Sequence, residues 1–325
     1  MTVPRYDEHD PEAYDRPRRR TRPRTKDRPT YADAHTGLVV AVERGRLTCM
    51  VEGVRVMAMK SRPLGRKGVV VGDTVRLVGD LTGRDGSLAR IVEVGERRTT
   101  LRRTADDDDP VERVIVANAD QLVIVTALAD PEPRTGLIDR ALVAAYDAGL
   151  DPLLCLTKAD LATPADLLAI YEPLGVPFVV TQRGANLTEV QARLRGRQSV
   201  LLGHSGVGKS TLVNALVPAA ARETGSVNVV TGRGRHTSTS AVVLPLPDGG
   251  WIVDTPGIRS FGLAHVDAAQ LIEAFPDLSD LSLDCSRGCT HEADEPECAL
   301  DDHPELAERV ASYRRLLGSR AVRDY

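Results

Sequence analysis

The chain has 325 residues, enough for two or three domains, of which 42% are hydrophobic and 27% charged, as in a globular protein. No run of about 18 apolar residues occurs and the N-terminus is polar and Arg-rich, so neither a transmembrane helix nor a signal peptide is expected. We therefore expect a cytoplasmic protein without membrane contacts. The formal net charge of −4 conceals an uneven distribution along the chain.

The first predicted region is a disordered basic arm over residues 1–35. Residues 16–28 contain eight Lys or Arg and one Asp, together with two prolines, and cannot bury a core. Such an arm is suited to neutralising phosphates on nucleic acid, although a solvated tail without a specific role has the same composition.

Residues 36–104 are predicted to form a small β-barrel. Five short apolar segments, GLVVAVE, LTCMVE, VRVMAM, DTVRLVG and ARIVEVG, are separated by Gly-containing turns, and no helix-length period occurs. A five-stranded OB-fold fits this count, and OB-folds commonly bind oligonucleotides. A small SH3-like barrel fits nearly as well.

A charged linker, RRTADDDDP at 102–110, is expected to separate the barrel from an α/β domain over 112–262. The segments QLVIVTA, PLLCL, PFVV and SVLLG are apolar enough to be buried strands. LIDRALVAAYDAGL and TPADLLAIYEPLG are predicted helices between them, and SAVVLPL and WIVDTPG add two more strands. This alternation predicts a mainly parallel sheet.

Residues 203–211 contain a phosphate-binding motif. Gly203, His204, Ser205, Gly206, Val207, Gly208, Lys209 and Ser210 match G-x-x-x-x-G-K-[ST], and Thr211 follows. A predicted strand precedes the motif and a predicted helix follows it, so backbone amides and the helix N-terminus would face phosphate oxygens. Lys209 would contact the β/γ phosphates and Ser210 would ligate Mg²⁺. The motif alone does not select ATP or GTP, nor a kinase or a hydrolase.

The strand WIVD leads into a second phosphate-sensing motif, Asp254-Thr-Pro-Gly257. Asp254 is expected near the Mg²⁺, and Gly257 is expected to turn its amide toward the γ-phosphate. The Gly/Arg/Ser/Thr-rich segment 231–243 offers Thr237 and Thr239 as magnesium ligands, without a basis for choosing between them, or is a plain surface loop.

The residue after this motif, Ile258, cannot orient the attacking water as a Gln does in Ras. Slow unaided turnover is therefore expected. His236 is the candidate catalytic residue because it lies beside the two threonines, although a histidine that faces solvent or RNA fits the sequence equally well.

The segment Thr157-Lys158-Ala-Asp160 follows a predicted strand and suits guanine recognition. The Asp160 carboxylate can accept hydrogen bonds from guanine N1–H and the 2-amino group, which adenine does not offer. Lys158 would pack along the base. Thr157 stands where Asn is usual, which weakens the expected tether to the phosphate loop.

The guanine element precedes the phosphate loop, the reverse of the usual GTPase order, as in a circular permutation. With a barrel in front and a Cys/His cluster behind, the chain resembles the RsgA (YjeQ) family over about residues 36–300. The resemblance implies GTP hydrolysis stimulated by the 30S ribosomal subunit, binding to 16S rRNA, and a role in late small-subunit maturation alongside other assembly factors. It also implies an apolar residue at the position of Ile258. We expect a monomer.

The C-terminal region, 263–325, is predicted to be a small helical zinc-binding domain. Cys285-x3-Cys289-x-His291-x6-Cys298 offers three thiolates and one imidazole, a closed set for one structural, tetrahedral Zn²⁺. The family spacing, Cys-x4-Cys-x-His-x5-Cys, differs by one residue in two gaps, so the loop geometry is expected to differ. His303 is expected to be a surface residue. Because the unit follows the γ-phosphate motif closely, the nucleotide state is predicted to reposition it.

Two other functions remain open on the sequence. Ile258 also suits a nucleotide-gated RNA-binding module in which hydrolysis is incidental. A P-loop kinase of a small substrate is a third interpretation, which Asp160 and the Asp254 motif disfavour.

Overall fold

A computed structural model describes residues 31–43, 45–64, 68–103, 113–218, 241–255, 263, 266 and 268–320. The chain divides into two units, Met1–Ala32 and Asp33–Tyr325, and the fold below is that of the second. Residues 1–30 of the expected basic arm and residues 104–110 of the expected linker lie outside the described residues, whereas residues 31–35 are described and His35 begins β1.

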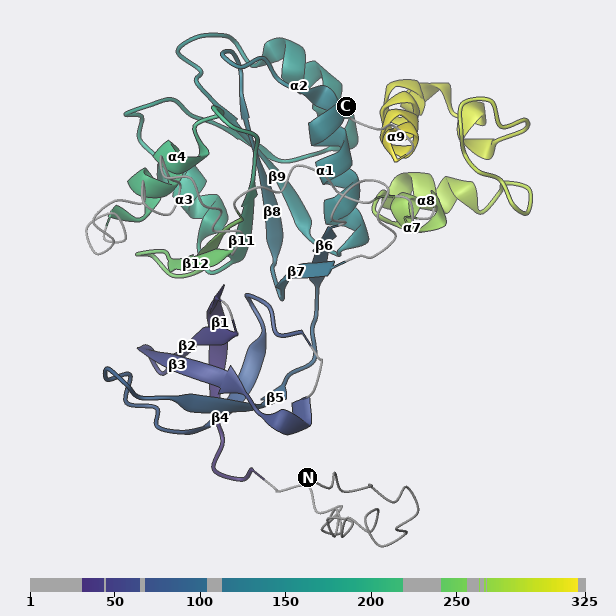
Figure 1. Ribbon diagram of the computed structural model, residues 1–325. Helices are drawn as coiled ribbons and strands as arrows, with labels where there is room; N and C mark the ends of the chain where they lie inside the picture. Colours follow the sequence, from purple (N-terminus) through teal and green to yellow (C-terminus); the bar gives the residue numbers. More distant parts are fainter. Residues whose placement is uncertain are drawn as a thin grey trace, which may run out of the picture. The chain divides into compact units, whose positions relative to one another are not determined.

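The N-terminal region of the second unit is a closed barrel of five strands: β1 (His35–Glu43), β2 (Arg46–Val51), β3 (Val54–Lys60), β4 (Thr74–Gly79) and β5 (Ala89–Val94) (Figure 1). The sheet order β1-β2-β3-β5-β4 closes because β4 also pairs with β1. Inward-facing side chains such as Val39, Leu77 and Ile91 are fully buried. The predicted strands and the barrel are confirmed. A short 3-10 helix, η2, spans Arg62–Leu64.

Two strands that the sequence did not reveal connect the barrel to the next domain. β6 (Thr100–Arg103) pairs antiparallel with β7 (Arg113–Ala117). The prediction of a solvated linker from residue 102 is therefore wrong for Arg102 and Arg103, which complete a strand. Their charged side chains obscured the backbone pairing that holds the segment in place.

The α/β domain contains β8 (Gln121–Ala127), β9 (Asp151–Thr157), β10 (Phe178–Val180), β11 (Gln198–Leu202), β12 (Val242–Pro245) and β13 (Trp251–Asp254). The sheet order is β10-β9-β8-β11-β13-β12, parallel except for β12. β12 also pairs with β1 at Ala41 and Val242, so one continuous hydrogen-bonded sheet includes the barrel. This pairing was not predicted, because an isolated contact between distant segments leaves no periodic signal.

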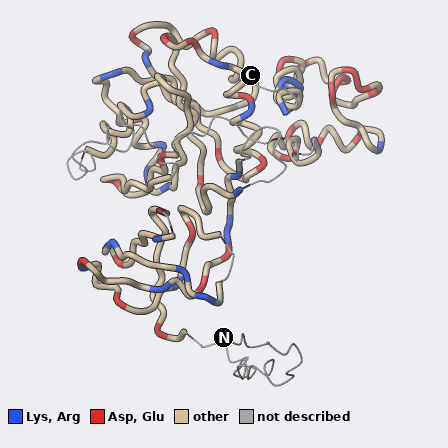
Figure 2. The backbone as a smooth tube through the Cα atoms, in the orientation of Figure 1, with Lys and Arg blue, Asp and Glu red and all other residues tan. Residues whose placement is uncertain are grey.

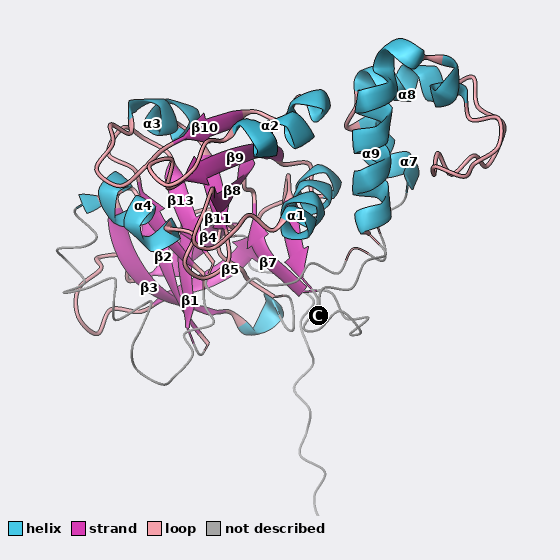
Figure 3. Cartoon of the chain, turned by 90° about the horizontal axis from the view of Figure 1, so that it is seen from above, coloured by secondary structure: helices cyan, strands magenta, loops and turns pink. Residues whose placement is uncertain are grey.

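Helices cover both faces of the parallel sheet (Figure 3). α3 (Thr188–Leu194) and α4 (Lys209–Leu216) pack on one face, against side chains such as Val123 and Leu201. α1 (Thr135–Asp147) and α2 (Ala165–Tyr171), followed by the 3-10 turn η3 (Glu172–Leu174), pack on the other, against Leu122 and Ile124. Alternate residues of β8 thus face opposite cores, which explains why the whole strand is apolar.

The C-terminal unit contains α7 (Ala268–Glu273), α8 (Pro276–Ser282), η4 (Ala299–Asp302), η5 (Pro304–Leu306) and α9 (Ala307–Ser319). It packs against α1 and η3 of the α/β domain. Phe275 lies at the centre of this contact, with edge-on rings of Tyr146 and Tyr313 at 5.1 and 5.6 Å between centroids. Among the described helices, none is long and apolar enough to cross a membrane.

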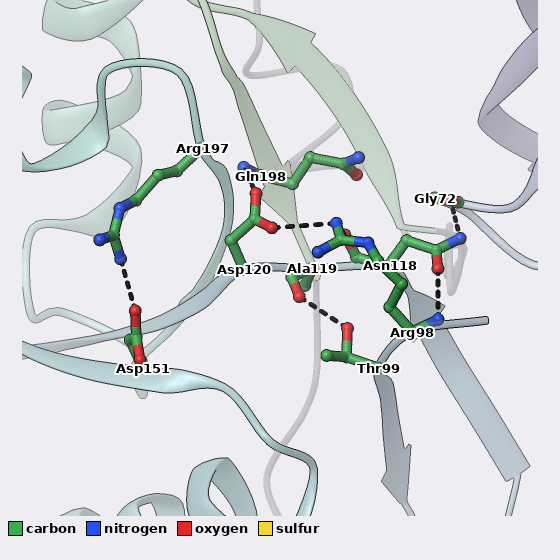
Figure 4. A network of polar contacts seen from close by, with 9 residues as sticks. All are labelled: Gly72, Arg98, Thr99, Asn118, Ala119, Asp120, Asp151, Arg197 and Gln198. Atoms are coloured by element: carbon green, nitrogen blue, oxygen red, sulfur yellow. Dashed lines mark hydrogen bonds and ion pairs between the residues drawn. The ribbon is translucent and has the colours of Figure 1, made fainter.

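A polar network lies where the barrel meets the α/β sheet (Figure 4). Asn118 has a left-handed backbone, φ 56°, and its side chain donates to the Gly72 carbonyl at 2.9 Å and accepts from the Arg98 amide at 2.9 Å. The Asp120 carboxylate accepts from the Arg98 guanidinium at 3.0 Å and from the Gln198 amide at 2.7 Å. The network thus connects the barrel to the start of β11.

Candidate nucleotide-binding site and metal cluster

The phosphate motif occupies the turn between β11 and α4, as predicted. Gly206 and Gly208 have φ values of 88° and 91°, in the left-handed region that glycine adopts without strain. Gly208 is also the residue that precedes the first turn of α4. Because the free N–H groups of a helix point out of its N-terminus, this turn is suited to a phosphate group.

Gly203 is required for a different reason. A Cβ atom there would lie 2.5 Å from the Val125 carbonyl oxygen and 2.9 Å from a methyl of Val207. The first residue of the motif therefore packs directly against β8. Val207 is itself fully buried, which anchors the loop while the flanking Ser205 and Gly206 stay exposed.

Thr157, at the end of β9, is in contact with the phosphate loop. Its hydroxyl lies 2.6 Å from the Val207 carbonyl oxygen and 3.2 Å from the Thr126 carbonyl oxygen. The shorter distance, to Val207, is the one typical of an O–H···O hydrogen bond. The Thr157 side chain is also 3.7 Å from a Cβ built on Gly208. The single hydroxyl thus supplies a direct link to the loop, where the sequence suggested a weakened one.

Lys158 reaches the loop after β8, a segment that the sequence analysis missed. Its ammonium donates a hydrogen bond to the Asp130 carbonyl. Pro131 of the same loop would lie 3.4 Å from a Cβ on Gly206. Asp130 and Pro131 therefore lie beside the site, and their position after a fully buried strand at the same sheet edge was the available signal.

Asp160 is exposed and follows the left-handed Lys158, φ 58°. The backbone amide of Ala159 donates to the Thr181 carbonyl at 3.2 Å, and the Thr181 amide donates to Leu156 at 2.8 Å. The turn is thus held against Thr181, the residue after the predicted strand β10, by a contact that the sequence did not indicate. These contacts place a carboxylate on the surface beside the phosphate loop.

Lys209, the first residue of α4, forms an ion pair with Asp254, the last residue of β13. Their Nζ and Oδ1 atoms are 2.8 Å apart, and both side chains are mostly buried. The pairing follows from the parallel register of β11 and β13, in which Leu201 is opposite Asp254. The next residue, Thr255, bonds through its hydroxyl to the Leu201 carbonyl at 3.2 Å. The start of the Asp254 motif is thereby fixed beside the loop lysine.

The remaining predicted residues of this site separate into two groups. His204 has its Nδ1 3.0 Å from the Ser205 carbonyl, whereas Ser210 and Thr211 begin α4. His236, Thr237, Thr239, Gly257 and Ile258 lie outside the described residues.

The four predicted metal ligands converge in the C-terminal unit. The ligand atoms of Cys285, Cys289, His291 and Cys298 all lie within 4.8 Å of one another. The three sulfurs are 3.4 to 3.7 Å from His291 Nδ1. The altered spacing does not separate the ligands, because the left-handed backbone of His291, φ 59°, turns its ring toward the sulfurs.

The chemistry of this cluster fits a thiophilic cation such as zinc. Burial lowers the pKa of His291, which favours the neutral imidazole that metals bind. Burial raises the pKa of Cys289 to about 11, so three thiolates in this space need a cation to stabilise them. Arg314 donates to the His291 carbonyl at 3.1 Å and supports the ligand from α9.

Three sequence-distant elements therefore meet at the carboxyl ends of β9, β11 and β13, with the base-recognition candidate earlier in the chain than the phosphate loop. This fold and site define a circularly permuted P-loop GTPase. Residues 94–264 match the family model described as "RsgA GTPase", and the chain belongs to this family.

Two relatives and two solved structures illustrate the similarity. The chain is 43% identical over 224 residues to the small ribosomal subunit biogenesis GTPase RsgA of Pseudomonas aeruginosa. The matched region covers 65% of this chain and 66% of the relative, slightly under two thirds of the relative's length. A Vibrio vulnificus protein, RsgA 1 with the same description, is 35% identical over 89% of this chain and 80% of its own.

The fold similarity extends further along the chain. YjeQ from Thermotoga maritima superposes with a TM-score of 0.67 at 29% identity, over 90% of this chain and all of that one. YloQ, described as a circularly permuted GTPase, gives 0.66 over 92% of this chain and all of its own, and at 24% identity it supports the fold alone.

Proposed function

We propose that the protein binds and hydrolyses GTP and thereby assists assembly of the small ribosomal subunit. The relatives above are named for that process, and family membership supports GTP as the substrate. The observation that carries the proposal is the contact between the guanine candidate and the phosphate loop, at 2.6 Å between Thr157 and Val207.

In the proposed site, the amides of residues 203–211 hold the phosphates and Lys209 neutralises their charge. Lys209 is paired with Asp254, so binding of a phosphate to Lys209 would exchange one anionic partner for another. Asp254 would then be free to orient a water on Mg²⁺. Ser210 would be a direct magnesium ligand, with Thr237 or Thr239 as a second and Gly257 contacting the γ-phosphate.

Base selection is assigned to Asp160, with Lys158 stacked along the base. The exposed position of the carboxylate beside the anchored turn supports this role. Hydrolysis is assigned to a water positioned by His236 with help from the partner, because Ile258 offers no hydrogen bond. Turnover is therefore slow in isolation.

We further propose that the Cys₃His cluster holds one structural zinc ion. Four protein ligands leave no position open for substrate. The partners are the 30S subunit and its 16S rRNA, together with other assembly factors, and the protein acts as a monomer in the cytoplasm, where subunits assemble. The domain boundaries at 36–104, 112–262 and 263–325 belong to the same proposal.

GTP turnover measured with added 30S, 50S or 70S particles tests the proposal. We expect stimulation by 30S alone, at least about tenfold, because a partner must complete the catalytic site. GTP bound without stimulation by any particle would instead support a nucleotide-gated RNA-binding module.

Substitution Asp160→Asn tests base selection separately. An amide presents a donor that matches the 2-carbonyl of xanthine and opposes the 2-amino group of guanine. We expect GTP affinity to fall about 100-fold or more and xanthosine triphosphate to bind better than GTP. Asp166→Asn on α2, also exposed, is the matched control and should change neither affinity. Unchanged GTP preference in Asp160→Asn would remove Asp160 from the site.

A further inference from the structure

A pocket of about 470 Å³ lies in the C-terminal unit, away from the nucleotide site. One wall is a face of α9 formed by Ala307, Val310, Ala311 and Arg314, at the i, i+3, i+4 and i+7 spacing of neighbouring positions on a helix. The second wall comes from residues 300–304, with the buried Leu300 at the floor. The small alanine side chains leave the space that a larger residue would fill.

The floor of the pocket is apolar. Leu300 and Val310 are 1% and 3% exposed, and Pro304 and three alanines also line the pocket, beside the polar residues Asp301, His303, Arg314 and Arg315. A volume of this size matches a small-ligand site and exceeds a packing defect. An apolar side chain of a partner would therefore be desolvated on entry, which favours binding.

The two arginines of the pocket carry charges that are already matched. Arg314 forms two hydrogen bonds to the Asp301 carboxylate, at 2.6 and 2.9 Å. Arg315 lies 3.1 Å from Asp139 on α1. Neither guanidinium is therefore free to attract an anionic ligand into the pocket.

The unmatched charge around the pocket is negative. Asp294, Asp302 and Glu308 are exposed and adjoin the lining residues Ala293, Asp301 and Ala307 in sequence. Within the described part of the chain, none of the three carboxylates has an ion-pair partner. Acidic residues also gather along the outer loop of this unit in Figure 2. The surface thus repels nucleic acid phosphates and attracts cations.

We infer that this pocket binds a basic segment of a partner protein, one that inserts a single apolar side chain between Lys and Arg residues. The apolar floor takes the anchor, and the three carboxylates contact the flanking cations. RNA is disfavoured, because its phosphates would face the same carboxylates. This interaction adds a protein contact to the proposed function and does not depend on nucleotide hydrolysis.

The metal cluster supports the pocket wall. Arg314 lines the pocket and also holds the carbonyl of His291. Cys298 directly precedes the turn that carries Leu300 and Asp301. The pocket is therefore expected to be complete only when the cluster is folded.

Fluorescence anisotropy with the full-length protein and synthetic peptides tests the inference. The probe is a labelled nonapeptide of Lys and Arg with one central Phe. A peptide with Gly in place of Phe, an acidic peptide with Phe, and a single-stranded oligonucleotide are the comparisons. We expect the basic Phe peptide to bind, the Gly peptide to bind about tenfold more weakly, and the other two to show no binding at this pocket.

Matched variants assign the binding to the pocket. Ala311→Phe fills the space, with Ala165→Phe on the exposed face of α2 as its control. Asp302→Lys with Glu308→Lys reverses the rim charge, with Glu273→Lys and Asp280→Lys in the same unit as the control. Each pocket variant is expected to weaken binding about tenfold, and each control less than about twofold.

Equal binding by pocket and control variants would overturn the inference, as would absence of binding by the basic Phe peptide. Preferred binding of the oligonucleotide, lost in Ala311→Phe, would assign the pocket to RNA instead. Circular dichroism of each variant establishes that it is folded. GTP turnover of the variants is a separate measurement, so failure of the pocket proposal is distinguishable from failure of the GTPase proposal.

Discussion

The barrel and the C-terminal unit carry opposite charge and are attached to the α/β domain in different ways. Residues 36–104 contain 14 Lys or Arg against 7 Asp or Glu, whereas residues 268–320 contain 5 against 12. Figure 2 shows the same contrast. Phosphate contacts therefore favour the barrel, and cationic protein contacts favour the C-terminal unit.

The attachment of the barrel is mainly through the backbone. β1 pairs with β12, the Ala117 amide donates to the Val71 carbonyl at 2.9 Å, and Asn118 bonds to Gly72. Backbone pairing tolerates little displacement, because each bond has a fixed direction. The barrel is thus held at the start of β8 and, through Val242 of β12, beside Asp254 of the nucleotide site.

The attachment of the C-terminal unit is made by side chains, through the aromatic contacts of Phe275 and through long arginines. Arg309 bonds to the Pro173 carbonyl at 2.7 Å and to Asp277, and Arg315 bonds to Asp139 and to the Ile170 carbonyl. The contacted elements, α1, α2 and η3, flank the guanine candidate. In sequence, the C-terminal unit follows the Asp254 motif, which is expected to contact the γ-phosphate. In space, it packs against the elements that flank the proposed base-recognition residues. We therefore predict that the C-terminal unit, more than the barrel, changes position with the nucleotide state.

Of the changes considered, Gly72→Ala is expected to lower the stability of the protein most, because it disrupts the backbone junction of the barrel. Gly72 has φ 87°, and a Cβ would lie 2.0 Å from the Ala117 carbonyl oxygen, so the backbone junction must open. We expect a loss of about 3 kcal/mol or more in the free energy of unfolding, measured by urea denaturation. Gly86→Ala, at φ 83° with open space around it, is the control and should lose only about 1 kcal/mol. Equal losses would mean that the junction is not rigid.

Metal removal is expected to destabilise the C-terminal unit and to leave the barrel unchanged. A chelator that strips the Cys₃His cluster is expected to raise amide hydrogen exchange in η4 and α9 by about 100-fold or more, because the four ligands are then no longer held together by the cation. Exchange in β1–β5 should stay unchanged and serves as the internal reference. Protection of α9 that survives complete metal removal would show that helix packing alone holds the unit.

The sequence predicted most of this architecture because its signals are local. The five barrel strands, the strand PLLCL before Thr157 and the glycine pattern of the phosphate loop each carry a period or motif within a few residues. The four metal ligands were also identifiable by type. What failed was pairing at a distance: β1 with β12, β6 with β7, and α9 with α1.

Two details of the site also required coordinates. Because Thr157 stands where Asn is usual, the sequence suggested a weak link between the guanine element and the phosphate loop. The Thr157 hydroxyl nevertheless bonds to the Val207 carbonyl, and its direction is set by backbone geometry that no motif encodes. The position of Asp130 and Pro131 beside the site has no motif. It follows only from the parallel alignment of β8 with β11.

Arg315→Met should loosen the C-terminal unit without affecting the barrel. The substitution keeps the apolar stem over Tyr171, where the guanidinium carbon lies 5.3 Å from the ring centroid, but removes the partner of buried Asp139. We expect a loss of about 1–2 kcal/mol, seen as faster exchange in α9 and α2. Arg287→Met, an exposed arginine in the same unit, is the control and should change exchange little. Faster exchange spread equally into the barrel would contradict separate attachments.

The smallest expected effect is a pH dependence at the same contact. Burial raises the pKa of Asp139 above its usual value, and Arg315 only partly opposes this. The folded state thus holds this proton more tightly than the unfolded chain, a stabilisation fully present below the unfolded pKa of about 3.9 and lost as the pH rises through the raised value. Asp139→Asn cannot titrate.

Urea denaturation of wild type and Asp139→Asn at pH 4 and pH 7 measures this difference. The free energy of unfolding of wild type, relative to that of the variant, should decline from pH 4 to pH 7. At the higher pH the wild-type protein alone must bury a charged carboxylate at position 139. A relative stability that rises with pH would show that the Arg315 ion pair outweighs burial. In that case the C-terminal unit would be held by a strong ion pair, and its attachment would be closer in rigidity to that of the barrel.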